Sequence, residues 1–546
     1  MQLLFAALLS MGITVLLIPP LMQWSARLGV LDQPGGRKVH ANPIPRVGGI
    51  AMAVGMLVAL LVWGDIGVQL HAYLLAMIVL LMFGIQDDRL TLSPAWKLVG
   101  QVSAALIIMF YGGVNIGILR HVDVCELPMW LSVPITLLFI VGVTNAINLA
   151  DGLDGLAGGT TLLCLSGLLL LGLSSGKTDA TVMCVVIVGA VLGFLRYNTH
   201  PARIFMGDAG SQLLGFSAAF VSLLLTQDPD LPYSAALPLL LLGVPVIDTL
   251  TVMTERLLDG KSPFQADRTH VHHRLLALGF DHHEAVMVIY GMQAVLLVLA
   301  WQLRFVSDVV IVAVFACVSL GIVTLLRRAR LRSWRWRVIQ DGQPAQSWLR
   351  KQLRWLRQDE RLNRWVGYVI GSAIICYAAL LMVNGMTAPV DIRVLATIAA
   401  VVVLVSIVVR RAGTQAGWLE RAALYVSALI AVTLDRPGLL PDAVKFWLEL
   451  VIFMCLALTI AVRIYLSMDR RFRVTPLDML VLVVAIALPN LPGSVISVYA
   501  AGWMVTKVLL LLYGIENLSV SAGLQWRLLT GGTLLFLTAV ALSHGV

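Results

Sequence analysis

The chain has 546 residues, of which 59% are hydrophobic and only 13% are charged, and its formal net charge is +9. Its mean hydropathy of +0.89 excludes an ordinary soluble globular protein and a disordered chain, and it places the chain in a lipid bilayer. The six cysteines form no C-x-x-C pair and mostly lie inside apolar runs, so we expect neither a disulfide framework nor a zinc site.

Apolar stretches long enough to span a membrane, about 20 residues each, follow one another along the chain. Before residue 327 we expect eleven spans: 2–24, 47–64, 70–86, 96–114, 128–149, 156–175, 180–196, 209–227, 233–257, 284–303 and 305–326. The runs are continuous rather than alternating, which argues against a β-barrel. The sequence therefore predicts an all-α polytopic membrane helical bundle, with about 11 transmembrane helices in a core and about 7 in a C-terminal extension.

Composition divides the chain into three parts: a core over residues 1–326, a linker over 327–365 and a second bundle over 366–546. The linker holds twelve basic and three acidic residues, interleaved with five tryptophans. Such a segment between membrane spans is expected to lie on anionic lipid headgroups. Because of these membrane flanks, we do not expect it to bind nucleic acid.

Basic residues gather in the loops that follow the odd-numbered spans, whereas the alternate loops hold few. The positive-inside rule then puts the N-terminus outside and the basic loops in the cytoplasm. The first apolar stretch has no basic residue before it and no convincing cleavage site, so we interpret it as the first helix rather than a signal peptide.

Four polar motifs lie at the ends of apolar spans, all on the expected cytoplasmic side. They are Asp87-Asp88, the Asn-x-x-Asn-x-x-Asp-Gly-Leu-Asp run at 145–154, Gly-Asp-Ala-Gly-Ser at 207–211 and His-Val-His-His at 270–273. Acids in so apolar a chain are costly unless they hold a cation or a polar substrate. Four motifs on one face therefore predict a single site.

Oxygen-bearing side chains in these motifs suit Mg²⁺, which prefers hard oxygen ligands. Asp208 and Asn148 are the predicted ligands of Mg²⁺, with Mn²⁺ as the alternative ion. The other members of the run, Asn145, Asp151 and Asp154, are expected to bind substrate.

Cationic and aromatic groups complete the predicted site. His270, His272 and His273 lack the spacing of a structural zinc site. We interpret them, with Arg268, as donors to a pyrophosphate and keep metal ligation as the alternative. Phe205 is a candidate platform for a flat base, with helix-end packing as the alternative. Together these groups predict phosphoryl transfer beside a bilayer.

The motifs resemble the polyprenyl-phosphate N-acetylhexosamine-1-phosphate transferases, a glycosyltransferase family 4 group that includes WecA and MraY. The similar stretches are RKVHANPIPRVGG (37–49), Asp87-Asp88-Arg89, TNAINLADGLDGLAGG (144–159), YNTHPARIFMGDAGS (197–211), PVIDT (245–249) and DRTHVHHRLLALG (267–279). The resemblance covers about residues 1–326. It implies transfer of a sugar 1-phosphate from a UDP-sugar to a polyprenyl phosphate, such as undecaprenyl phosphate, with release of UMP.

The resemblance also implies roles for individual residues. Asp208 and Asn148 would bind the metal ion, and Asp87 and Asp88 would orient or deprotonate the lipid phosphate. The remaining residues would bind the pyrophosphate (Lys97 and the histidine motif) or line the nucleoside pocket (Asn198, Asp154, Phe205 and Lys38).

The His-Val-His-His motif resembles the WecA group rather than MraY. We therefore favour a UDP-N-acetylhexosamine donor, UDP-GlcNAc above all, over the MraY donor UDP-MurNAc-pentapeptide. The expected setting is the cytoplasmic face of a bacterial inner membrane, in cell-surface polysaccharide or O-antigen synthesis. A transporter or scaffold is the rival class. The sequence leaves open a homodimer, a glycan-pathway partner for the second bundle, and the role of Asp248 inside the ninth span.

Overall fold

A computed structural model of the chain describes residues 2–32, 43–65, 67–120, 124–258, 260, 270–331, 339–340, 343–344, 360–409, 418–435, 438–466, 496–519 and 524–543. These residues form helices joined by loops and by three short antiparallel hairpins, which confirms the predicted all-α class. The described helices fall into two compact units, one before and one after residue 345.

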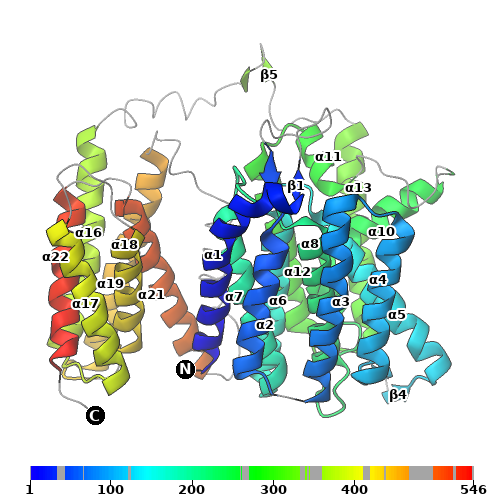
Figure 1. The fold of residues 1–546 in the computed structure, drawn as a ribbon, viewed down its shortest axis with the longest axis horizontal. Coiled ribbons are helices and arrows are strands. Elements are labelled where there is room, and N and C mark those ends of the chain that lie inside the picture. The colour runs from blue at the N-terminus through cyan, green and yellow to red at the C-terminus, as the bar shows by residue number, and fades with distance from the viewer. Residues whose placement is uncertain are drawn as a thin grey trace. The chain divides into compact units, whose positions relative to one another are not determined.

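The first unit contains the helices α1 (Gln2–Leu28), α2 (Gly48–Trp63), α3 (Val68–Leu90), α4 (Pro94–Leu106), the π-helix η1 (Ile107–Tyr111), α5 (Met129–Ala150), α6 (Leu156–Ser175), α7 (Thr178–Asn198), α8 (Gly207–Thr226), α9 (Pro238–Leu241), α10 (Gly243–Leu258), α11 (Val271–Ala277), α12 (His282–Leu303) and α13 (Asp308–Leu331) (Figure 1). Its hairpins pair β1 (Leu31–Asp32) with β2 (Ile44–Pro45), β3 (Ile118–Arg120) with β4 (Val124–Glu126), and β5 (Ile339–Gln340) with β6 (Gln343–Pro344).

Helix α8 is the central helix of the first unit. Of an 18-residue apolar stretch within it, 94% of the residues are buried. Helices α2, α3, α5 and α6 pack around it. From α3, the ring of Tyr73 stacks on Phe216 and Phe220, and its hydroxyl lies 2.7 Å from Ser217 Oγ. Because the surrounding helices enclose α8, its ends are held in place. Asp208 lies in its first turn, so the position of Asp208 is fixed as well.

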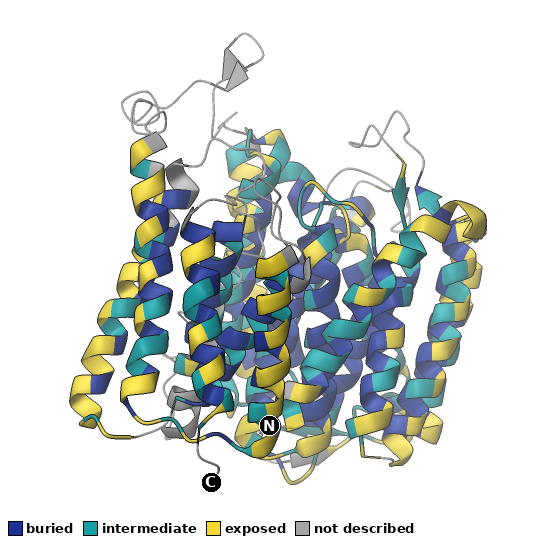
Figure 2. Cartoon of the chain, turned by 60° about the vertical axis from the view of Figure 1, so that its left-hand side comes forward, coloured by how far each residue is buried: buried dark blue, intermediate teal, exposed yellow. Residues whose placement is uncertain are grey.

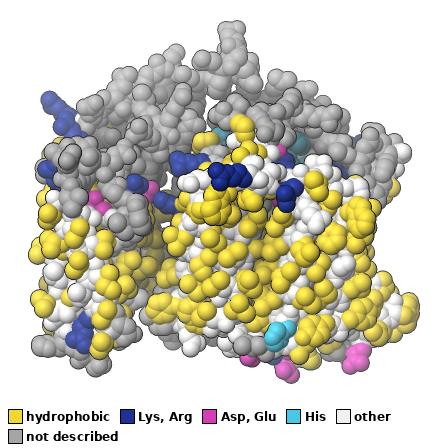
Figure 3. Space-filling model, in the orientation of Figure 1, with side chains coloured by type: hydrophobic (Ala, Val, Ile, Leu, Met, Phe, Trp, Pro, Cys, Tyr) yellow, Lys and Arg dark blue, Asp and Glu magenta, His cyan; other side chains and the backbone are white. Residues whose placement is uncertain are grey.

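Eleven of the described helices are long and apolar enough to cross a membrane. Their buried residues face inward and their exposed residues face outward (Figure 2). Hydrophobic side chains cover most of the visible side of the first unit, with basic groups toward one end and acidic groups at the other (Figure 3). The chain is therefore a multi-pass membrane protein.

The predicted ninth span, 233–257, is not one helix but two, because α9 ends at Leu241 and α10 begins at Gly243. The buried side chain of Gln293, on α12, occupies the break. Its Oε1 accepts the N–H of Val244 (3.0 Å), and its Nε2 donates to the carbonyl of Leu241 (2.8 Å). Backbone N–H and C=O groups that lose their helical hydrogen bonds at such a break need other hydrogen-bond partners inside a membrane. Pro245 lies in the first turn of α10, where its missing N–H costs little.

Other predicted boundaries also differ. The predicted span 47–64 is the 16-residue helix α2, and the span 96–114 continues from α4 into η1. Helix α13 runs to Leu331, five residues past the predicted end of the core. Most of the predicted linker, 327–365, lies outside the described residues.

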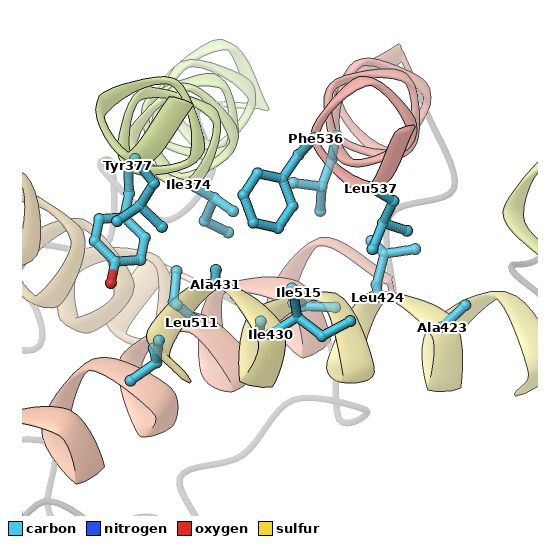
Figure 4. Packing of buried hydrophobic residues seen from close by; sticks show 14 of the residues in the cluster. Ile374, Tyr377, Ala423, Leu424, Ile430, Ala431, Leu511, Ile515, Phe536 and Leu537 are labelled. Carbon is cyan, nitrogen blue, oxygen red and sulfur yellow. The ribbon is translucent and has the colours of Figure 1, made fainter. Parts of the chain in front are cut away.

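The second unit contains α16 (Glu360–Val383), α17 (Val390–Val409), α18 (Trp418–Thr433), α19 (Asp442–Leu466), α21 (Ile496–Ser519) and α22 (Leu524–Ala541). About seven spans were expected there; six helices are described, and residues 467–495 lie outside the described residues. Tyr377 and Ile374 of α16 pack near Phe536 of α22 and Ile515 of α21 in an apolar core (Figure 4).

Four charged side chains are buried together in this second unit. Lys507 Nζ lies 2.5 Å from Glu449 and also pairs with Asp435, while Lys445 pairs with Asp435 and lies 3.8 Å from Glu449. The Tyr377 hydroxyl donates to Asp435 over 3.0 Å. Two cations thus balance two anions, which lets the group lie inside a membrane bundle.

Replacing Lys507 with methionine should destabilise the second unit, because one lysine would then face two buried carboxylates. Removing one partner of a buried ion pair costs roughly 3–5 kcal/mol. We expect a lower unfolding temperature in detergent, measured by tryptophan fluorescence. Leu528→Met, at a position on α22 that is 51% exposed, is the control and should leave the temperature unchanged. An equal effect of both variants would contradict a special role for the ion pairs.

Candidate active site

The four predicted polar motifs meet at one end of the first unit. Asp87 and Asp88 end α3, Asn148 ends α5, Asp208 begins α8, and His270 caps α11. Hydrogen bonds and ion pairs connect the first three of these motifs directly. The hydrogen bonds of Asp88 to Asp208 and Ala209 join residues that lie 120 and 121 positions apart in the chain.

Asp208 is the centre of this network. Its Oδ2 lies 3.0 Å from Lys97 Nζ, and its Oδ1 accepts the Asn148 amide at 2.6 Å. The same lysine lies 2.5 Å from Asp87 Oδ2, and Asn148 also donates to Ser211 Oγ at 2.7 Å. The Asp208 side chain is 26% exposed, whereas Asp87 is 2% exposed. Lys97 thus links the partly exposed carboxylate of Asp208 to the buried carboxylate of Asp87.

The Asp87 carboxylate also fixes the end of its own helix. Its Oδ1 accepts the backbone N–H of Leu92 over 2.7 Å, and its Oδ2 is covered by Lys97. A substrate could reach Asp87 only by displacing that lysine. Asp87 is therefore placed to orient Lys97 rather than to contact a phosphate freely.

Asp88 holds the start of α8. Its two carboxylate oxygens accept the backbone N–H groups of Asp208 (3.0 Å) and Ala209 (3.3 Å), and Arg46 lies 3.7 Å away. Gly207 makes this approach possible: its φ is +69°, and a Cβ there would lie 2.3 Å from Asp88 Oδ2. A carboxylate at a helix N-terminus is favourable for the orphan N–H groups and the helix dipole. Asp88 therefore positions the Asp208 loop.

Asn145 lies on α5, about one helical turn before Asn148 and farther from the end of the helix. Its amide donates to Gln101 Oε1 at 2.6 Å, and Gln101 also donates to Gln212 Oε1 at 3.2 Å. This amide chain joins α4, α5 and α8 below the carboxylates. Asn145, which the sequence predicts to bind substrate, ties these helices together through its side-chain amide.

The loop after α5 carries Asp151 and Asp154. Asp151 is exposed in this loop. Desolvation by the surrounding protein atoms, followed by the negative charges of Asp208, Asp154 and Asp88, holds the pKa of its carboxyl group above its ordinary value. Burial also raises the pKa of Asp154, but hydrogen bonds from His200 and the Ala202 N–H outweigh it and hold that pKa below its ordinary value.

Asn198 and Phe205 were predicted for the nucleoside pocket, and Asn198 contacts this loop. The buried Asn198 accepts the N–H of Gly155 at 2.9 Å and donates to the carbonyl of Ile204 at 2.8 Å. Its amide is therefore used to hold loops. The backbone of Phe205 bonds to Pro45 (2.8 Å) and Gly48 (3.0 Å), and its side chain is half-buried.

The histidine motif is anchored by Asp248. Its Oδ2 lies 2.9 Å from His270 Nδ1, and its Oδ1 accepts the backbone N–H of Val271 at 2.8 Å. Asp248 thus caps α11 and orients His270, which explains an acid that the sequence left without a role.

His272 packs against the acidic loop, since a Cβ on Gly152 would lie 2.3 Å from its Nε2. Burial, followed by the charge of His273, lowers the pKa of His272 to about 3, so the ring is neutral at pH 7. The rings of His272 and His273 lie 4.2 Å apart. Lys38 and Arg268 lie outside the described residues.

The donor set fits Mg²⁺. Asp208, Asp151 and the amide of Asn148 offer oxygen atoms, and a divalent cation held there would offset the neighbouring negative charges of Asp208, Asp151 and Asp88. The sequence assigned no individual role to Arg46 or Ser211, although both lie in the motifs named above, and it did not mark Gln101 as part of the site. A single Gln within a predicted helix carries no pattern that marks it.

A second group, Asp154, His200 and His282, has ligand atoms within 4.8 Å of one another. Two observations favour hydrogen bonding over a shared metal ion. Asp154 Oδ2 lies 2.6 Å from His200 Nδ1, and the rings of His200 and His282 stack at 4.3 Å with 28° between their planes. Stacked imidazoles direct their nitrogen lone pairs side by side, whereas metal ligands converge on one point.

Comparison with known proteins gives consistent similarities. The profile of glycosyl transferase family 4 matches residues 70–226. A Bacillus subtilis protein described as a probable undecaprenyl-phosphate N-acetylglucosaminyl 1-phosphate transferase is 39% identical over 289 residues, covering 51% of this chain and 78% of the relative. A Mycobacterium tuberculosis decaprenyl-phosphate N-acetylglucosaminephosphotransferase is 34% identical, covering 51% and 76%. An Escherichia coli K12 undecaprenyl-phosphate alpha-N-acetylglucosaminyl 1-phosphate transferase is 30% identical, covering 53% and 81%.

Proposed function

The chain belongs to the polyprenyl-phosphate N-acetylglucosaminyl 1-phosphate transferases of glycosyl transferase family 4, and from this premise we propose its reaction. It transfers GlcNAc 1-phosphate from UDP-GlcNAc to undecaprenyl phosphate and releases UMP. The reaction joins a soluble donor to a membrane lipid, so the site has to lie where helices meet the aqueous phase.

One observation carries the proposal: Asp208, Lys97, Asp87 and Asn148 form a connected charged group at the ends of membrane-length helices. Phosphoryl transfer depends mainly on positioning and on neutralising charge, so it needs few covalent participants. A transporter would instead place ionisable groups near the middle of the membrane.

In the proposed step, an oxygen of the lipid phosphate attacks the β-phosphorus of UDP-GlcNAc. A bond forms between that oxygen and the β-phosphorus, and the bond to the oxygen that bridges the α- and β-phosphorus atoms breaks. UMP leaves with the bonding electrons. The lipid phosphate is largely ionised at pH 7, since its second pKa is about 6, so no base is required.

The side chains of the site support this step. Lys97, held by Asp87, supplies positive charge to the phosphates, and the histidine motif on α11 donates hydrogen bonds to the pyrophosphate. Asp88 fixes the start of α8 and therefore the position of Asp208. Asp208, Asn148 and Asp151 would hold Mg²⁺, or Mn²⁺ in its place, which when bound neutralises charge on the pyrophosphate oxygens.

The donor sugar and the cellular setting follow from the relatives and the charge pattern. All three relatives are described as acting with N-acetylglucosamine, which favours UDP-GlcNAc over the alternative UDP-MurNAc-pentapeptide. The basic loops support a site on the cytoplasmic face of a bacterial inner membrane. The product would feed cell-surface polysaccharide synthesis, such as that of O-antigen.

The test is an assay of purified protein with UDP-GlcNAc, undecaprenyl phosphate and Mg²⁺. We expect UMP release that requires all three additions. Parallel reactions contain UDP-GalNAc or UDP-MurNAc-pentapeptide, and turnover of the pentapeptide donor in preference to UDP-GlcNAc would overturn the assignment of the sugar. Absence of UMP with every donor would overturn the reaction.

Shortening the chain after Pro344 should leave turnover within about twofold of the full chain, because the site lies wholly in the first compact unit, which has its own core. A cut after Leu326, the predicted core boundary, would fall inside α13. The measurement is UMP release by the folded, monodisperse fragment. A folded but inactive fragment would show that the second unit takes part in catalysis.

A further inference from the structure

The loop that carries Asp154 is held from two sides. On one side, the Asn198 side chain accepts the N–H of Gly155 over 2.9 Å. On the other, the hydroxyl of Tyr290, on α12, donates to the carbonyl of Gly155 over 2.7 Å. A loop tied to two helices in this way holds the backbone of Asp154 in one place.

The carboxylate of Asp154 is then oriented by a second set of contacts. His200 Nδ1 lies 2.6 Å from Oδ2, and the backbone N–H of Ala202 donates to the same oxygen over 3.1 Å. No residue that the structure describes donates to Oδ1 of Asp154. The side chain is 19% exposed, so one oxygen is fully used and the other remains available to a ligand.

His200 is itself fixed by two histidines at the start of α12. Its ring stacks on His282 with a centroid distance of 4.3 Å and meets the edge of His283 at 4.8 Å. His282 Nε2 also approaches the carbonyl of Asp154 at 3.5 Å. This packing limits rotation of the His200 ring and keeps its Nδ1 directed at Asp154.

We propose that His200 is a positioning residue that turns Oδ1 of Asp154 toward the base of the donor nucleotide and thereby sets the preference for uridine over cytidine diphosphate sugars. This inference rests on the proposed function, in which the donor is a uridine nucleotide, and on the expectation from the sequence that Asp154 lines the nucleoside pocket. Uracil presents an N3–H donor that a carboxylate oxygen accepts. Cytosine presents an acceptor at N3, which a carboxylate repels. A side chain that fixes the carboxylate therefore discriminates between the two bases.

The test compares His200→Ala, His200→Gln and His200→Asn in the full-length protein, with UDP-GlcNAc and CDP-GlcNAc as donors. Asparagine places an amide N–H where the imidazole Nδ1 lies, whereas glutamine places it farther out and alanine provides none. For the Ala and Gln variants we expect the KM for UDP-GlcNAc to rise about tenfold or more, the value of one hydrogen bond to a charged group. The ratio of kcat/KM for the two donors should fall by a similar factor.

The His200→Asn variant should keep most of the preference for UDP-GlcNAc over CDP-GlcNAc. In all three His200 variants, kcat at saturating donor and the KM for undecaprenyl phosphate should change little. Asp154→Asn, which exchanges an acceptor for a donor, is the positive control and should shift the preference toward CDP-GlcNAc. If activity is too low for kinetics, calorimetric binding of UMP and CMP gives the same ratio.

Equal losses with both donors, and an unchanged ratio, would overturn the proposal, because a merely structural defect would not distinguish the bases. Normal discrimination in His200→Ala would do the same. Failure of the proposed function is recognised separately: the unaltered protein would then turn over no UDP-sugar at all.

Discussion

Replacing Asp208 with asparagine should reduce turnover by about a thousandfold or more, because the variant loses the partly exposed carboxylate at the centre of the site. The substitution keeps the size of the side chain, and Asn148 retains an oxygen to which it can donate. Lys97 would remain paired with Asp87. We therefore expect a folded protein whose UMP release is lower by that factor.

A matched control for this substitution is Asp228→Asn. Asp228 lies just after the other end of α8, where its carboxylate is 2.5 Å from Lys177. It is an acid of the same unit with a comparable ion pair, but it is remote from the motifs. UMP release should be nearly unchanged in Asp228→Asn. Near-normal turnover of Asp208→Asn at saturating donor would contradict the central place given to that carboxylate.

Replacing Asp88 with asparagine should weaken the apparent affinity for Mg²⁺ by about 10- to 100-fold, the usual effect of losing a group that orients a metal ligand. Only one amide oxygen would remain to serve the N–H groups of Asp208 and Ala209. The start of α8, and with it Asp208, would be held less firmly. The measurement is UMP release over a wide range of Mg²⁺ concentration.

High Mg²⁺ should restore a substantial part of the activity of Asp88→Asn, because the Asp208 carboxylate itself is intact. Asp87→Asn serves as the comparison. Its effect should be on kcat and should persist at high Mg²⁺, since Asp87 orients Lys97 rather than the Asp208 loop. An unchanged Mg²⁺ affinity in Asp88→Asn, with a lower kcat at every concentration, would show that Asp88 acts on substrate directly.

The sequence predicted the class of fold well, and it predicted that the polar motifs would lie together, for a physical reason. In a bilayer, each span has to be a long apolar helix, so spans are visible as composition. Polar motifs then stand out at the ends of the spans, and the charge of the loops sorts them onto one side. The convergence of Asp87, Asn148 and Asp208 follows from those two patterns.

Individual side-chain contacts could not be predicted from the sequence in the same way. Nothing in the sequence shows that Gln293 fills a break between α9 and α10, or that Asp248 reaches His270. Adjacent aspartates look alike in sequence, yet Asp88 bonds to the backbone of α8 while Asp87 pairs with a lysine. Such differences arise from tertiary packing, which places the partners of each carboxylate only once the helices are assembled.

The most direct test of the central claim follows the β-phosphorus of the donor. Purified protein would be incubated with UDP-GlcNAc labelled with ³²P at the β-position, undecaprenyl phosphate and Mg²⁺, and the lipid and aqueous products would be separated. Transfer of GlcNAc 1-phosphate predicts that the label enters the lipid as a pyrophosphate-linked sugar, while unlabelled UMP is released. Label that remains in the aqueous phase as UDP, beside a lipid that has gained only the sugar, would contradict the account.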